Sequence, residues 1–295
     1  FSEWNDRFRD TVRRFWITDT QPGAPSGIGM QEMATRLCGS SDLFATEPGR
    51  GCVSSINYVS CHDGFTLTDL TPVKHNEANG ENNIDGSNVN HSANFGVEGP
   101  SDDPAIIRKR EQAAMNMLGT LMLSLGTPMM LAGDEFGNSQ SGNTWLNWDW
   151  MYQTRKTMQM HRLDTVSRLL SIRKSLGLYH HEEFFTRLTQ LGLFKPSSRV
   201  QWYLPDGTTP MDRDWFDTPI RSFAKRLLSQ DEVDVLIVIN GVDEVRRFTL
   251  PSDCSWQCDW RSATAIGLRP APGDRLQRIG KNQALRSNWT MSVRE

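Results

Sequence analysis

The sequence of 295 residues has no long hydrophobic run and no excess of basic charge. Its longest apolar run, residues 121–132, contains Ser124, Gly126, Thr127 and Pro128, so it is too short and too interrupted to span a bilayer. Lys and Arg number 32 against 35 Asp and Glu, which gives a net charge of −3. Because nucleic acids and anionic membranes require basic patches, we expect neither as a partner.

Cysteines are few, odd in number and scattered, as Cys38, Cys52, Cys61, Cys254 and Cys258. This pattern does not indicate a disulfide framework. Cys254 and Cys258 have no second pair of ligands, so a zinc site there is not expected. We expect reduced thiols in a cytoplasmic protein, with no metal and no cofactor. No secretory signal is visible.

Residues 1–180 have the pattern of an α/β fold. Apolar residues at helical spacing or capping signals predict helices at 3–16, 30–37, 103–124 and 163–176. Runs of apolar residues predict buried strands at 53–60 and 129–133. The alternation indicates β/α units with a parallel sheet, in which functional residues lie in the loops after the strands. His62-Asp63 and Asp134-Glu135 occupy such positions.

Residues 181–295 have a different sequence pattern. Short strand-like runs such as VQWYL and VDVLIVIN alternate with Pro, Gly and Asp turns. That pattern is typical of an antiparallel β domain. The sequence therefore predicts two domains, with a boundary near residue 180.

Asp63 is the strongest catalytic candidate in the chain. A carboxylate just past a buried strand can stabilise positive charge or accept hydrogen bonds from sugar hydroxyls, and His62 can donate to a sugar oxygen. The alternative is that Asp63 only caps a turn. Residues 76–104 follow as a long polar loop, a kind that is usually functional or disordered. The arginines of RDTVRR are expected to pair with acidic neighbours on a solvated face.

Several long motifs resemble the bacterial glycogen debranching enzymes, which are isoamylase-like members of the α-amylase superfamily. The motifs, in chain order, are EWNDRFRDTVRRFW (3–16), VSCHDGFTLTDL (59–70), KHNEANGENNIDG (74–86), FGVEGPSDDP (95–104) and LSLGTPMMLAGDEFGNSQSGN (123–143). The resemblance is strong over residues 1–180 and weaker, but in register, across the rest.

The resemblance implies a retaining hydrolase of α-1,6 branch linkages in glycogen or limit dextrin. It implies strands six to eight of a (β/α)8 barrel in residues 1–180 and a β-sandwich in residues 181–295. Asp63 matches the family's third catalytic Asp, after the seventh strand, and His62 matches its sugar-binding neighbour. The loop 74–86 would line the glucan cleft, with Asn76 and Glu77 as substrate contacts.

The sequence also departs from the family pattern. The family's nucleophile and general acid lie in motifs upstream of EWNDRFRD, and neither motif is present in these residues. Retaining chemistry needs those two carboxyl groups about 5–5.5 Å apart, so this chain alone is expected to be inactive and to need the N-terminal part of the barrel, in the same or another chain. Compared with the family pattern, about ten residues of a loop over the cleft are also absent after Asn143.

Other interpretations stay open. The chain can be a non-catalytic remnant that binds glucan or a partner protein. The loop 74–86 can be a solvated loop or a calcium site, since oxygen-rich loops bind calcium. A metal phosphohydrolase built on His62-Asp63 would need further His and Asp ligands on helices, whereas His75 and His91 are predicted in loops.

Overall fold

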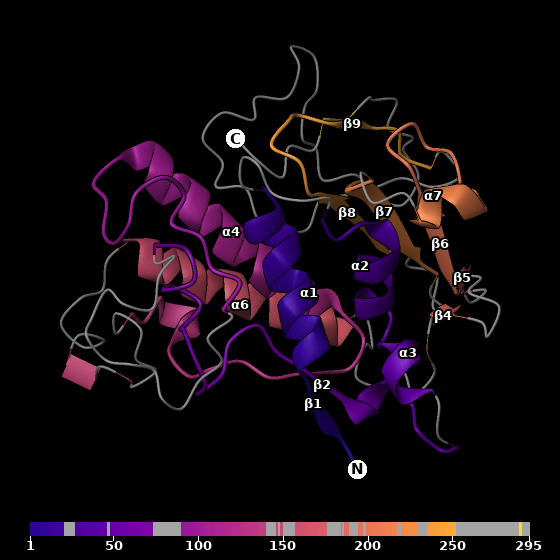
Figure 1. Cartoon of the computed structure of the whole chain (residues 1–295), viewed down its shortest axis with the longest axis horizontal. Helices are drawn as coiled ribbons and strands as arrows, with labels where there is room; N and C mark the ends of the chain where they lie inside the picture. The colour runs from indigo at the N-terminus through magenta and orange to yellow at the C-terminus, as the bar shows by residue number, and fades with distance from the viewer. Residues whose placement is uncertain are drawn as a thin grey trace.

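A computed structural model shows an α/β first half and an antiparallel β second half (Figure 1). The residues that the structure describes are 1–20, 27–45, 48–72, 90–139, 146, 148–149, 157–175, 184, 186–188, 194–196, 199–216, 220–228, 235–251 and 289–290. Among them, no helix is both long enough and apolar enough to cross a membrane.

A three-stranded parallel sheet lies in the first half. It consists of β1 (Glu3–Asn5), β2 (Ser55–Asn57) and β3 (Thr127–Pro128), in the order β1-β2-β3. Parallel neighbours need crossover connections, and helices lie in both connections. The predicted β/α units are therefore confirmed.

Helices cover this sheet and connect its strands. They are α1 (Asp6–Trp16), α2 (Met30–Leu37), α3 (Ser41–Phe44), α4 (Pro104–Leu123) and α6 (Thr157–Ser175), with the 3-10 turns η1 (Thr18–Thr20), η2 (Cys52–Ser54) and η4 (Asp134–Phe136).

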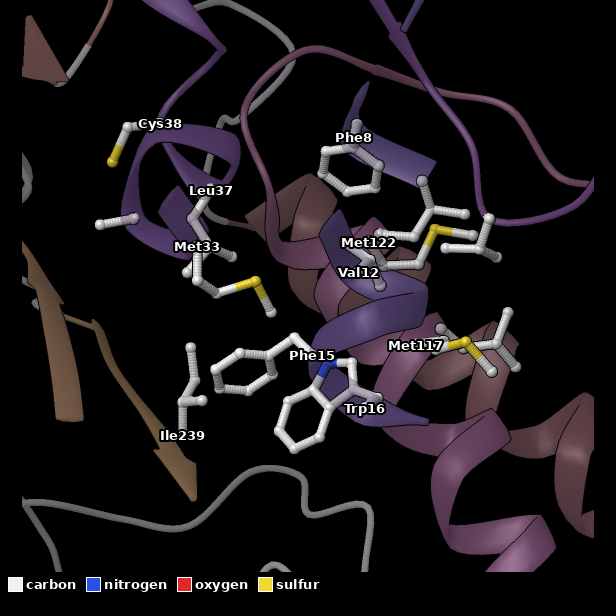
Figure 2. Close-up of a cluster of buried hydrophobic side chains, with 14 of the residues drawn as sticks. Phe8, Val12, Phe15, Trp16, Met33, Leu37, Cys38, Met117, Met122 and Ile239 are labelled. Carbon is white, nitrogen blue, oxygen red and sulfur yellow. The ribbon is translucent and has the colours of Figure 1, made fainter. Parts of the chain in front are cut away.

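Helix α1 forms the centre of the hydrophobic core. The Asn5 side chain caps it by accepting from the Phe8 N–H at 2.8 Å. The apolar stripe Phe8, Val12 and Phe15, predicted from helical spacing, is fully buried. In Figure 2 these side chains lie between those of α2 and those of α4, so α1 is packed from both sides.

Helices α4 and α6 confirm two predicted helices. Each end of α4 lies within one residue of its prediction, whereas α6 begins six residues before its predicted start. Asp103 caps α4 by accepting from the Ala105 N–H at 2.8 Å. At the other end of α4, the buried guanidinium of Arg173 on α6 donates to the carbonyls of Met122 and Ser124 at 2.8 and 2.6 Å. These bonds satisfy carbonyls that a helix end leaves without partners.

The first strand prediction was correct in type but too long, and the second was misplaced. The predicted strand 53–60 is shortened to β2 because residues 52–54 form η2. The predicted strand 129–133 is not formed, and the ladder lies two residues upstream, at β3. The Met129 N–H still bonds the Asn57 carbonyl at 2.7 Å, after which Gly133 turns the chain with a φ of +100°.

The second half contains small antiparallel sheets. Its described elements are β4 (Thr186–Leu188), β5 (Phe194–Pro196), β6 (Val200–Tyr203), α7 (Asp212–Phe216), β7 (Ser222–Leu227), β8 (Val235–Asn240), β9 (Arg247–Phe248) and β10 (Trp289–Thr290). The sheet β6-β7-β8 pairs Tyr203 with Ala224 and Ser222 with Asn240.

The two halves share one core. All six residues of β7 are buried, and Phe223 stacks edge-on against Phe15 with ring centroids 6.4 Å apart. The ammonium of Lys225 is fully buried, which lowers its pKa, and it donates to the Leu37 carbonyl at 3.0 Å. Figure 2 shows Ile239 of the β6-β7-β8 sheet beside Phe15.

Candidate functional site

The loop after β2 exposes the two predicted site residues. The chain is buried from Tyr58 to Cys61 and then turns outward. The side chain of His62 is 68% exposed and that of Asp63 is 46% exposed, with His62 Nε2 3.2 Å from Asp63 Oδ1. The structure therefore brings His62 and Asp63 together at the carboxyl end of the central strand, where the sequence predicted them.

A buried carboxylate holds this loop from beneath. Asp134 accepts from the Ser60 hydroxyl and, at 3.0 Å, from the Leu67 N–H. Burial raises the pKa of Asp134 to about 6, although both hydrogen bonds oppose the shift. Asp134 follows β3 as predicted, but its side chain is inaccessible, so it positions the loop and does not meet a ligand.

The loop is also fixed from the side of α1. Arg13 is buried and donates to the carbonyls of Val59 at 2.7 Å and Asn90 at 3.0 Å. The prediction that the arginines of this helix lie on a solvated face was therefore wrong for Arg13. Buried backbone carbonyls after β2 need donors, and a long side chain from α1 reaches them.

An aromatic ring packs against His62. The exposed ring of Trp4 on β1 meets the imidazole edge-on, with centroids 5.6 Å apart. Trp4 also packs against Tyr58 at 5.6 Å, and the Arg9 guanidinium lies 5.7 Å from the Tyr58 ring. Sequence reasoning missed Trp4, because only the pairing of β1 with β2 places it beside the loop.

A buried ion pair lies behind the loop. Arg162 of α6 and Glu111 of α4 are each less than 10% exposed, and the guanidinium binds both carboxylate oxygens. Arg162 also donates to the Thr68 hydroxyl at 2.8 Å. The segment 60–69 is thus tied to two helices as well as to Asp134. Such pairs fix geometry more reliably than they add stability.

Two predicted substrate contacts, Asn76 and Glu77, lie outside the described residues. A pocket of about 450 Å³ opens elsewhere, lined by residues of α1, α2 and α7 and by His91. Neither His62 nor Asp63 lines it, so its volume does not bear on the loop after β2.

This arrangement suits a neutral, hydroxyl-rich ligand. Asp63 offers acceptor oxygens, His62 offers a ring nitrogen, and Trp4 offers an exposed ring. The rigid support behind the loop keeps these groups in place before a ligand arrives, which lowers the cost of binding.

No family model matches the chain, but curated relatives do. It is 36% identical over 269 residues to a "Glycogen debranching enzyme" of Serratia proteamaculans, covering 87% of this chain and 36% of the relative. It is 37% identical over 277 residues to a "Glycogen operon protein GlgX homolog" of Mycobacterium tuberculosis, covering 86% and 36%. A "Glycogen debranching enzyme" of Escherichia fergusonii is 48% identical over 161 residues, half of this chain.

Solved structures agree at the level of the fold. Apo pullulanase from Paenibacillus barengoltzii superposes with a TM-score of 0.50 at 18% identity, covering 87% of this chain and 34% of the pullulanase. Pullulanase from Anoxybacillus sp. LM18-11, solved as a complex with maltotriose, gives 0.51 at 18% identity, covering 89% and 31%.

The chain spans about a third of the length of the curated relatives. It shares more than a third of its residues with each of them across most of its own length. The chain is therefore a homologue of the bacterial glycogen debranching enzymes and corresponds to their C-terminal part.

Proposed function

We propose that this chain is the C-terminal part of a debranching glycoside hydrolase. The enzyme would cleave α-1,6 branch linkages of glycogen or limit dextrin, with retention, in the cytoplasm. The observation that carries this proposal is the exposed Asp63 and His62 pair at the end of the central strand, in a chain homologous to glycogen debranching enzymes.

Asp63 would stabilise the reacting sugar and would not attack it. Its carboxylate accepts hydrogen bonds from ring hydroxyls, and these bonds strengthen as the oxocarbenium-like state forms. His62 would donate to a sugar oxygen, and Asn76 and Glu77 would contact the glucan from the following loop. The nucleophile and general acid would come from the upstream part of the barrel, so this chain alone would be inactive.

The parallel sheet would be strands six to eight of a (β/α)8 barrel within residues 1–180, and residues 181–295 would form a β-sandwich domain. The sheet supports the need for an N-terminal partner segment because, among the described residues, β1 and β3 each have only β2 as a neighbour. Open edges of parallel sheets are normally covered. Phe1, Trp4 and Val53 are exposed near β1, so apolar surface is also left uncovered there.

The test is Asp63→Asn in the chain combined with its upstream barrel region. The variant keeps the size of the side chain but removes its charge and places an amide donor where an acceptor is needed. We expect kcat on a branched dextrin to fall by roughly 10² to 10⁴, which is about 3–5 kcal/mol of transition-state stabilisation. KM should change much less, because the interaction acts on the chemical step.

The matched control is Asp102→Asn, which removes an exposed carboxylate just before α4. It should retain full kcat. If Asp63 only caps a turn, Asn should serve equally well. Retention of more than about a tenth of wild-type kcat by Asp63→Asn, with an unchanged melting temperature, would reject the proposal.

A further inference from the structure

We propose that Cys61, His62 and Asp63 form a binding site for a thiophilic divalent cation such as Zn²⁺. Each residue offers one ligand atom, and the three atoms lie within 4.8 Å of one another. The site would be inhibitory, because it uses the same two side chains that meet the glucan; this consequence, unlike the binding itself, rests on the proposed function.

The ligand geometry fits zinc closely. Zinc binds imidazole nitrogen and carboxylate oxygen at about 2.0–2.2 Å in a tetrahedron, which places two such ligands about 3.3 Å apart. His62 Nε2 and Asp63 Oδ1 are 3.2 Å apart. A thiolate ligand at about 2.3 Å lies about 3.5 Å from the other two ligands, so the three atoms would have to approach one another by up to about 1.3 Å. Cys61 Sγ would exchange its hydrogen bond to the Asp63 carbonyl, 3.6 Å long, for the metal bond and release its proton to solvent.

The donor atoms of the trio select against hard cations. The Cys61 thiol interacts electrostatically with the guanidinium groups of Arg9 and Arg13. These positive neighbours oppose any divalent cation, and calcium and magnesium, which depend on several oxygen ligands, find a single carboxylate in the trio. Zinc and cobalt gain instead from the sulfur and nitrogen ligands themselves.

Access and orientation are both provided by the fold. His62 and Asp63 face solvent, so an ion can enter and water can complete its coordination. The Trp4 ring packs edge-on against the imidazole and limits its rotation. Cys61 is held at the buried end of the loop, directly after Ser60, which is bonded to Asp134. Because these contacts restrict the ligand groups before an ion arrives, less rearrangement is needed to bind it.

Binding is tested by titrating the chain with Co²⁺ at neutral pH and recording the sulfur-to-cobalt charge-transfer band. We expect a saturable band at one Co²⁺ per chain that Zn²⁺ displaces and Ca²⁺ does not. Cys61→Ala should abolish the band. His62→Ala should weaken Zn²⁺ affinity by at least about tenfold, the loss that even an outer-shell substitution causes.

The matched control is the double variant Cys254→Ala/Cys258→Ala, which removes the other closely spaced thiols of the chain and should keep the band. Circular dichroism checks that each variant is folded, and His62→Ala guards against a misfolded Cys61→Ala because its side chain is 68% exposed. A band that survives Cys61→Ala, or an affinity that His62→Ala leaves unchanged, would overturn the proposal. Because the readout is metal binding, the result does not depend on whether the chain takes part in hydrolysis.

Discussion

Asp63 and Asp134 both follow strands of one sheet, yet their surroundings differ completely. Asp63 is about half exposed beside His62, whereas Asp134 is fully buried and bonded to Ser60 and to the Leu67 backbone. A buried carboxylate disfavours its charged form, while an exposed one keeps its acceptor oxygens available to a ligand. At the residue scale, burial therefore separates the candidate for catalysis from the residue that positions it.

The raised pKa of Asp134 predicts a specific pH dependence of stability. In the folded chain the pKa is about 6, above its ordinary value of 3.8. The folded state therefore holds the proton more tightly than the unfolded state. This contribution is fully present below about pH 4, falls as the pH rises, and is lost above about pH 6. The change amounts to about 3 kcal/mol for two pKa units.

Asp134→Asn removes this titration and keeps the size of the side chain. The stability of the variant minus that of wild type should rise by up to about 3 kcal/mol as the pH increases from roughly 4 to 7. Urea unfolding of both proteins across that range measures the difference in unfolding free energy. The titration of all other groups cancels in this difference because both proteins contain them. A difference that does not vary with pH would show that the pKa of Asp134 is the same in the folded and unfolded states.

At the scale of elements, Gly64 lets the loop after β2 turn back into the core after the exposed His62 and Asp63. Its φ is +105°, and an added Cβ would lie 2.6 Å from the Asn90 side-chain oxygen. Gly64→Ala should therefore both strain the backbone and displace Asn90 or the loop. We expect a loss of more than about 2 kcal/mol of stability, because the clash adds to the cost of the positive φ.

Gly96 is the control for that prediction. Its φ is +98°, and nothing lies within 4 Å of an added Cβ. Gly96→Ala should therefore show only the backbone cost, about 1–2 kcal/mol. Thermal unfolding of the two variants side by side separates strain from steric conflict. Equal losses would mean that Asn90 does not restrict the loop.

Arg221 joins the β6-β7-β8 sheet to the helices of the first half. Its guanidinium donates to the carbonyls of Gly241 at 3.0 Å, Ile28 at 2.9 Å and Phe15, and it lies 4.4 Å from the Phe15 ring. Arg221→Met keeps much of the apolar stem but leaves these carbonyls without their donor. We expect unfolding free energy to fall by about 2–4 kcal/mol.

Arg213→Met provides the comparison, since the Arg213 side chain is 79% exposed and pairs only at 3.7 Å with Asp214. That change should cost well under 1 kcal/mol. Urea denaturation gives both values. A small loss for Arg221→Met would imply that the two halves are held together mainly by apolar contacts such as Phe15 with Phe223.

At the scale of the whole molecule, the chain carries one member of the proposed catalytic set. Incubated alone with phosphorylase-trimmed glycogen, it should release no reducing ends beyond a heat-inactivated sample. The physical reason is that a retaining mechanism requires a nucleophile and an acid across the scissile bond, and the resemblance places both upstream. Circular dichroism shows whether the assayed chain is folded. Release of short maltooligosaccharides by the folded chain would contradict the assignment of roles.

Local features follow from the amino-acid sequence alone. Apolar spacing and capping residues predicted α2 and α4 closely, because helices depend on contacts within one segment. They also predicted α1, but the first three residues of the predicted helix, 3–5, form β1 instead. Turn residues and short alternating runs likewise predicted antiparallel strands in the second half. The placement of His62 and Asp63 at the end of a strand also followed from local pattern, helped by the family resemblance.

Features that depend on distant partners became visible in the folded chain. Strand ends are set by the neighbouring strand, so β3 forms at 127–128 and not at 129–133. Arg13 is buried because carbonyls of Val59 and Asn90, far along the chain, need a donor. Trp4 reaches His62 through the pairing of β1 with β2, and Asp134 is buried because the 60–67 loop closes over it. A polar side chain's environment is set by what folds against it, which its own neighbours in sequence do not specify.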